Sequence, residues 1–125
     1  MNFFQRRKIL KRSNLLDLTP IRIHEHIEEE EGKLTLLVPK FRNKKLSNFI
    51  IRQGRPKFFR IHLDEFGSAA WLEMDGKKNM KTICDNLSEK FGDNIQPVEQ
   101  RISKYLTTLY DQRYITFVEL QNTNK

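Results

Sequence analysis

The apolar residues of this chain change their spacing near Asp64, and this change limits the folds that the chain can adopt. Before Asp64 they alternate with polar residues, as Leu34, Leu36 and Val38 do, which is the period of a β-strand. After Asp64 they recur every three or four residues, which is the period of an amphipathic helix. An order of strands followed by helices predicts an α+β fold.

Three strands are predicted before the change. In residues 21–27 the isoleucines occupy one parity and Arg22, His24 and His26 the other, which indicates a strand. Gly32 supplies a turn, and residues 34–38 repeat the alternation until Pro39, so these two segments are expected to form a hairpin. Residues 57–63 form the third predicted strand, with Phe59, Ile61 and Leu63 facing one way and Phe58, Arg60 and His62 the other.

Three helices and a short last strand are predicted after it. The first helix begins at the cap candidate Asp64 and ends at Gly76, with one face formed by Phe66, Ala69, Ala70 and Met74. The second begins near Asn79 and stops at Gly92, and the third begins at Pro97, a favoured first position. Residues 114–120 are expected to form a short strand or wing.

A single domain is expected, because 125 residues fit the usual size of one compact domain. The one cysteine, Cys84, excludes an internal disulfide and a multi-cysteine metal site, and it suits a reducing compartment. The basic start of the chain lacks the continuous apolar stretch of a signal peptide, and no segment is long enough to cross a bilayer. We therefore expect a cytoplasmic protein.

Charge is distributed unevenly along the chain. Residues 1–60 carry 15 Lys and Arg against 6 Asp and Glu, whereas residues 61–125 carry 8 against 10. A basic first half indicates an anionic partner, which could be nucleic acid, lipid headgroups or an acidic peptide. The basic segments 3–12 and 40–57 interleave apolar and cationic residues, so membrane-surface or nucleic-acid contact through them is one interpretation, and a solvated loop and terminus is the other.

The stretch FFRIHLDEFGSAAWLEMDG at residues 58–76, followed by ICDNLSEKFG and VEQRISKYLTTLYDQRYI, resembles the PqqD family. The resemblance rests on a strand ending in Leu-Asp, a helix closing on an Asp-Gly step, and two further helices with matching apolar spacing. It implies a winged-helix-like fold in which a three-stranded antiparallel sheet is followed by three helices. The domain limits become a basic segment 1–18, a PqqD-like domain 19–120 with an insertion at 40–56, and a polar tail 121–125.

The resemblance also implies a function without catalysis or cofactor. The family binds the leader of a precursor peptide as an added strand beside the third strand, against the third helix, and presents it to a radical-SAM or other modifying enzyme. An exposed strand edge suits this role because its free N–H and C=O groups can extend a ladder. Carried over by position, the peptide-binding residues are Lys57, Phe58, Phe59, Arg60, Ile61, His62, Leu63, Arg101, Lys104, Tyr105 and Thr108.

Plainer roles remain open for several of these residues. Tyr105 could belong to the core, and Arg101 and Lys104 could be solvated surface. The outward N–H of the edge belongs to either Arg60 or Ile61, depending on register. Together, Lys57, Arg60, Arg101 and Lys104 would favour an acidic ligand.

Other kinds of site find less support in the sequence. His24 and His26 would share a face on a strand, but a metal site needs a third ligand, and none is fixed, so no metal is predicted. No nucleophile and base pair is visible, and Cys84 lies on an apolar stripe where packing is its expected role. The alternative function is a winged-helix nucleic-acid-binding protein, although its reading helix would carry a nearly neutral set of charges, namely Glu99, Arg101, Lys104 and Asp111.

Overall fold

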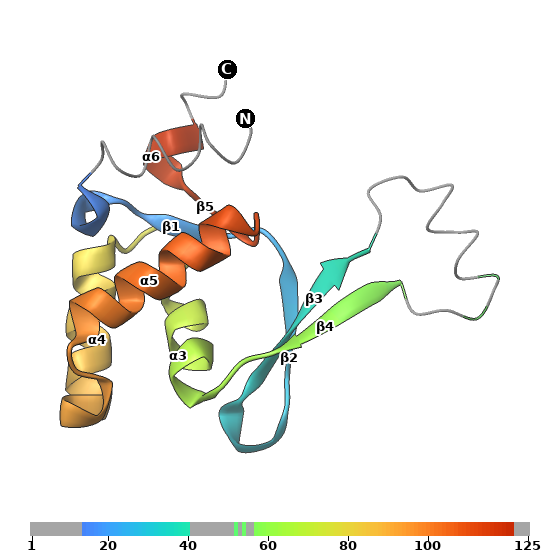
Figure 1. Cartoon of the computed structure of the whole chain (residues 1–125), viewed down its shortest axis with the longest axis horizontal. Coiled ribbons are helices and arrows are strands. Elements are labelled where there is room, and N and C mark those ends of the chain that lie inside the picture. Colours follow the sequence, from blue (N-terminus) through green and yellow to red (C-terminus); the bar gives the residue numbers. More distant parts are fainter. Residues whose placement is uncertain (1–13, 41–51, 53, 55–56, 122–125) are drawn as a thin grey trace. The chain divides into compact units, whose positions relative to one another are not determined.

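The computed structural model describes residues 14–40, 52, 54 and 57–121, which fall into two compact units (Figure 1). One unit contains the chain up to Ile23 and from Phe66 onward, and the other is His24–Glu65. The predictions for residues 1–13, for most of the insertion 40–56 and for the tail residues 122–125 lie outside the described residues. The predicted division into residues 1–18, 19–120 and 121–125 is not tested by the structure and stays a prediction.

The unit His24–Glu65 is a three-stranded antiparallel sheet. Its strands are β2 (Glu25–Glu28), β3 (Leu34–Pro39) and β4 (Phe58–His62), in the order β2-β3-β4. The short 3-10 turn η2 (Glu30–Gly32) joins the first two, and Gly32 has the positive φ of 72° that this turn requires. β3 is the central strand, and its residues Leu34, Thr35 and Leu36 are buried.

The other unit packs helices on a two-stranded sheet. Three of its helices follow one another after the sheet of the first unit, as predicted, so the predicted α+β fold is confirmed. Its elements are η1 (Leu15–Asp17), β1 (Pro20–Arg22), α3 (Glu65–Glu73), α4 (Met80–Phe91), η3 (Gly92–Ile95), α5 (Val98–Asp111), β5 (Ile115–Phe117) and α6 (Val118–Gln121).

The predicted first strand is divided in the structure. Residues 20–22 form β1, which pairs with β5, whereas residues 25–28 form β2, which pairs with β3. Ile23 and His24 belong to neither strand, and the Ile23 amide donates to the Tyr114 carbonyl oxygen at 3.0 Å. The expected hairpin therefore exists, but only from Glu25 onward, and His24 and His26 do not share one strand.

The helices begin and end close to the predicted residues. The Asn79 side chain accepts a hydrogen bond from the Thr82 amide at 2.9 Å, which caps α4, and α4 ends at Gly92 as predicted. α5 begins at Val98, one residue after Pro97. In the first helix Ala70 and Met74 are buried as predicted, but Phe66 and Ala69 are only half-buried. The buried face is rotated toward the fully buried Trp71, with Gly67 and Ser68 beside it.

The backbone of β1 is hydrogen-bonded along both edges. On one side it pairs with β5, where Ile21 lies opposite Thr116. On the other side the Arg22 amide donates to the Met74 carbonyl oxygen at 3.2 Å, and the Gly76 amide donates to the Pro20 carbonyl oxygen at 3.0 Å. β1 thus joins the C-terminal strand to the turn that follows α3.

Residues flanking β1 extend this connection to α4 and α6. The Met80 amide at the start of α4 donates to the Leu18 carbonyl oxygen at 2.8 Å. The Thr19 amide and hydroxyl both donate to the Glu119 carboxylate at 2.7 Å, and the Val118 amide donates to the Thr19 carbonyl oxygen at 2.9 Å. This segment therefore holds together elements that lie far apart in the sequence.

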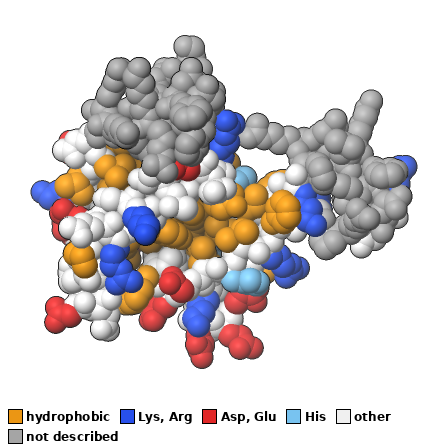
Figure 2. Space-filling view, viewed as in Figure 1, with side chains coloured by type: hydrophobic (Ala, Val, Ile, Leu, Met, Phe, Trp, Pro, Cys, Tyr) orange, Lys and Arg blue, Asp and Glu red, His pale blue; other side chains and the backbone are white. Residues whose placement is uncertain are grey.

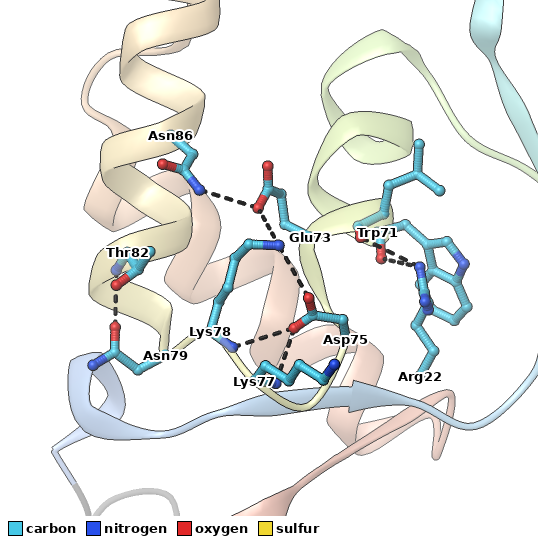
Figure 3. A network of polar contacts seen from close by, with 10 residues as sticks. Arg22, Trp71, Glu73, Asp75, Lys77, Lys78, Asn79, Thr82 and Asn86 are labelled. Carbon is cyan, nitrogen blue, oxygen red and sulfur yellow. Dashed lines mark hydrogen bonds and ion pairs between the residues drawn. The ribbon is translucent and has the colours of Figure 1, made fainter.

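A polar network fixes the turn between α3 and α4 (Figure 3). One oxygen of Asp75 accepts hydrogen bonds from the Lys77 and Lys78 amides at 2.9 and 3.2 Å. The Lys78 ammonium lies 3.0 Å from the other Asp75 oxygen and 3.3 Å from Glu73, which also accepts from the Asn86 amide nitrogen at 3.2 Å. Lys78 thus connects Asp75 to Glu73 on α3, and Glu73 connects this turn to Asn86 on α4.

Replacing Gly76 with alanine is expected to lower the free energy of unfolding by about 1–3 kcal/mol, because φ is positive here and strained for an L residue. The added Cβ would also lie 2.9 Å from Ile21 Cδ1. Gly32→Ala is the matched control, because its φ is also positive but nothing lies within 4 Å. Urea denaturation should give a larger loss for Gly76→Ala, and Ile21→Val should recover part of the difference. Equal losses would contradict the contact.

The stability of the unit is expected to fall as the pH drops from about 4 to about 2. The hydrogen bond from the Lys77 amide and that from the Lys78 side chain lower the pKa of Asp75 from 3.8 to about 2. A carboxyl whose pKa is lower in the folded chain stabilises it above the unfolded pKa, and this contribution is lost as the pH falls through the folded pKa. Urea midpoints measured across this range should fall less steeply in Asp75→Asn, and identical profiles would exclude this role.

Candidate peptide-binding site

One edge of β4 has no partner strand among the described residues. β4 is the last strand of the sheet, and no described strand pairs with its outer side. The residues just before and just after β4 bond toward β3. The Lys40 amide donates to the Lys57 carbonyl oxygen at 3.1 Å, and the Leu63 amide donates to the Leu34 carbonyl oxygen at 2.9 Å. Inward bonding alternates along an antiparallel pair, so Phe59 and Ile61 also bond inward.

The outward backbone groups therefore belong to Phe58, Arg60 and His62. The sequence left the outward position open between Arg60 and Ile61, and the register of β4 against β3 assigns it to Arg60. These three residues present a row of N–H and C=O groups that an extended chain could continue as a fourth strand.

Side chains on the two faces of β4 differ in character, as their alternation predicted. Phe59 and Ile61 lie opposite Val38 and Leu36 and share their face of the sheet. Phe59 is 54% exposed, so its ring is accessible to a ligand at this edge. Figure 2 shows hydrophobic side chains gathered over β3 and β4 in this view.

Two lysines meet at the start of β4. Lys40 and Lys57 are joined through their backbones, and their ammonium groups lie 5.2 Å from the Phe59 ring centre and 5.6 Å from the Phe58 ring centre, respectively. These cation–π contacts hold positive charge beside the exposed Phe59 and the half-buried Phe58. This end of the edge suits an anionic side chain.

A hydrogen bond between neighbouring strands fixes the other end of β4. Thr35 is fully buried, and its hydroxyl lies 2.9 Å from His62 Nδ1. The contact orients the imidazole across the sheet. An open pocket of about 470 Å³ lies beside it, lined by Glu29, Glu30, Glu31, Lys33, Leu34, Thr35, His62 and Leu63.

The second group of predicted residues lies on α5, in the other unit. Arg101, Lys104, Tyr105 and Thr108 are spaced by three and four residues, so they form one stripe along the helix. This stripe flanks the buried one, which contains Ile102, Leu106 and Leu109 among others. The structure thus brings the predicted residues together within each unit.

Arg101 is held in place by two contacts. Its Nη1 donates to the Asn94 carbonyl oxygen at 2.9 Å, and its guanidinium lies 5.1 Å from the Phe66 ring centre. Phe66 in turn packs edge-to-face on Phe91 with ring centres 4.7 Å apart. Arg101 therefore joins α5 to α3 and η3, while the exposed residue retains further donors.

The remaining α5 residues differ in how firmly they are bound. The half-buried Tyr105 donates its hydroxyl proton to the Gly67 carbonyl oxygen at 3.1 Å, which ties α5 to α3. Thr108 donates to the Lys104 carbonyl oxygen at 2.9 Å, within the helix. Lys104 is exposed. Tyr105 thus has a structural contact, as the plainer interpretation held, and Lys104 is exposed, as is Arg101.

Other candidate residues do not form a further site. Among the described residues, no group of three or more His, Cys, Asp or Glu is placed to hold a metal ion. Cys84 is buried as predicted, and burial is the main cause that raises its pKa to about 11, which keeps the thiol protonated and unreactive. In the part of the chain that the structure describes, no helix is long and apolar enough to span a membrane.

The acidic turn at Glu29–Glu31 was missed as part of the site. The sequence shows these residues as an acidic run, but only the pairing of β2, β3 and β4 places the run at the end of the open edge. A charged turn between two strands of a predicted hairpin was the signal available.

Comparison with known proteins identifies the class of this segment. The model of the family described as coenzyme PQQ synthesis protein D (PqqD) matches residues 57–115, which run from just before β4 to the start of β5. The match confirms the resemblance predicted from the sequence, and it covers β4 and the three helices that follow. No curated protein and no solved structure gives a significant match.

Removing the Tyr105 hydroxyl is expected to cost stability. Tyr105→Phe eliminates the bond to Gly67 and should lower the free energy of unfolding by about 0.5–1.5 kcal/mol, the usual net value of such a bond. Lys104→Gln changes an exposed residue of the same stripe and serves as the control, with an expected effect within about 0.5 kcal/mol. Urea denaturation measures both. An unchanged midpoint in Tyr105→Phe would mean that the hydroxyl is not structural.

Proposed function

We propose that this chain is a non-catalytic peptide-binding protein that presents a precursor peptide to a modifying enzyme, such as a radical-SAM protein. The open edge of β4 is the observation that carries the proposal. It lies inside the segment that matches the PqqD family, and its outward backbone groups are those of Phe58, Arg60 and His62. An added strand would satisfy these groups without any other change in the sheet.

In this proposal the backbone provides most of the affinity, and side chains select the peptide. The exposed Phe59 can pack against apolar peptide residues on one face of the sheet, while Arg60 meets residues on the other. The α5 stripe with Arg101 and Lys104 is the second proposed contact. Such a small interface suits a dissociation constant near roughly micromolar, or about 8 kcal/mol of binding free energy.

The alternative of a sequence-reading nucleic-acid protein finds little support. α5 carries Glu99 and Asp111 beside Arg101 and Lys104, and a helix that enters the major groove normally has an excess of positive charge.

Replacing Arg60 with proline is expected to abolish peptide binding while the fold is kept. Proline removes the outward N–H, and an edge strand tolerates this because the lost donor belongs to no ladder. Arg60→Thr is the matched control, because it removes the same charge but keeps the N–H and a β-forming residue. The probe is a peptide selected on the full chain from a random display library, and calorimetry should show at least a tenfold loss for proline beyond that for threonine.

Backbone amide shifts during the same titration test both halves of the site. We expect shifts on residues 57–63 and on residues 98–110. Shifts that cluster on residues 21–38 and leave both of these ranges unmoved would show that the proposed site is wrong. Equal losses in Arg60→Pro and Arg60→Thr would show that strand addition is not the mode of binding.

A further inference from the structure

We infer that the stretch of peptide paired with β4 carries opposite charges at its two ends, with an acidic residue beside Lys40 and Lys57 and a basic residue beside Glu29–Glu31. This inference rests on the proposed strand addition and names the class of peptide that the edge selects. It differs from the acidic ligand that Lys57, Arg60, Arg101 and Lys104 together had indicated.

Positive charge is concentrated where β4 begins. Lys40 and Lys57 form a backbone pair there, and Arg60 lies at the middle of β4. Among the described residues, no ion pair links these three cations to a carboxylate. Figure 2 shows cationic side chains toward the right end of the sheet in this view. Their charge is therefore available to a ligand at this end.

Negative charge is concentrated where β4 ends. The turn η2 and its preceding residue place Glu29, Glu30 and Glu31 around the pocket beside His62. Lys33 lies 3.9 Å from Glu31, but both side chains are largely exposed, so this pair is weak. The three carboxylates outnumber this single ammonium, and Figure 2 shows acidic side chains toward the lower end of the sheet in this view. A cationic peptide side chain fits here.

The length of β4 fixes the spacing of the two charges. β4 spans the five residues Phe58–His62, and a strand rises about 3.3 Å per residue, so the ends lie roughly 13–17 Å apart. A paired peptide has the same rise, which puts its acidic and basic residues about four to six positions apart. Which charge comes first along the peptide then reports whether the added strand runs parallel or antiparallel to β4.

A polyanion fits this edge less well than such a peptide. A nucleic acid carries a phosphate at every step, so the part of it near Glu29–Glu31 would be repelled. A uniformly acidic peptide would meet the same repulsion. Charge complementarity along the whole edge is reached only by a ligand whose sign changes along its length.

Display selection with the full chain tests the inference directly. Peptides enriched on the wild-type chain should carry an acidic and a basic residue about four to six positions apart. Against such a peptide, Lys57→Glu/Arg60→Glu should weaken binding roughly three- to tenfold, and changing the acidic peptide residue to lysine should restore it. The double variant Glu29→Lys/Glu30→Lys should weaken binding by a similar factor, and changing the basic peptide residue to glutamate should restore it. Lys77→Glu/Lys81→Glu changes two exposed cations in the other unit and should leave affinity unchanged.

The outcomes separate this inference from the proposed function. If Arg60→Pro abolishes binding but the charge reversals do not change which peptides are selected, strand addition stands and the charge pattern is wrong. If Arg60→Pro binds as tightly as Arg60→Thr, the proposed site itself fails. Enrichment of uniformly acidic peptides, or their displacement by oligo(dT), would overturn the inference in favour of a polyanion site.

Discussion

The helical unit depends on a three-residue strand that is hydrogen-bonded on both sides. β1 pairs with β5 along one edge and accepts or donates bonds at Met74 and Gly76 along the other. Because the flanking residues also bond the start of α4 and the start of α6, one short segment closes the unit around Trp71 and Phe117, both fully buried. The orientation of α5, and hence of its stripe of polar residues, follows from this closure together with the bond from Tyr105 to Gly67. β1 and its flanking residues, which make these contacts, come before the segment that matches the PqqD family.

In the sheet unit, the register of β4 against β3 has the corresponding role. It decides which residues bond inward and which present backbone groups to the outside, and a shift of one residue would exchange Arg60 for Ile61 on the open edge. The buried Thr35 and its contact with His62 across the pair help to fix this register, since the two residues lie directly opposite each other. A buried hydroxyl that needs a partner is costly to displace, so a slipped register would leave Thr35 unsatisfied.

Local patterns predicted the elements well, and distant pairings could not be predicted. α4 has a strong apolar stripe, a capping asparagine and a terminal glycine within a few residues of each other, and its bounds were predicted closely. β1 has only three residues, and its partner strand β5 is far away in the sequence, just as Thr19 and its partner Glu119 are 100 positions apart. No local pattern therefore separates β1 from β2. The buried face of α3 was rotated because glycine and serine pack there beside Trp71, and neither residue counts toward an apolar stripe. For the site, alternation gave the two faces of β4, but the outward backbone positions depend on the partner strand.

The charge of the candidate site also differs from what the charge of the sequence suggested, for a physical reason. The excess of Lys and Arg in residues 1–60 indicated an anionic partner, yet an electrostatic contact is governed by the charges within about one Debye length, roughly 8–10 Å, of the bound group. Antiparallel pairing places Lys40 beside Lys57 at one end of β4 and brings the turn before β3 to the other end. The acidic run 28–31, which leaves that half of the chain strongly basic, thereby becomes the dominant charge at one end of the edge. Topology, more than composition, determines which sign a bound peptide meets at each position.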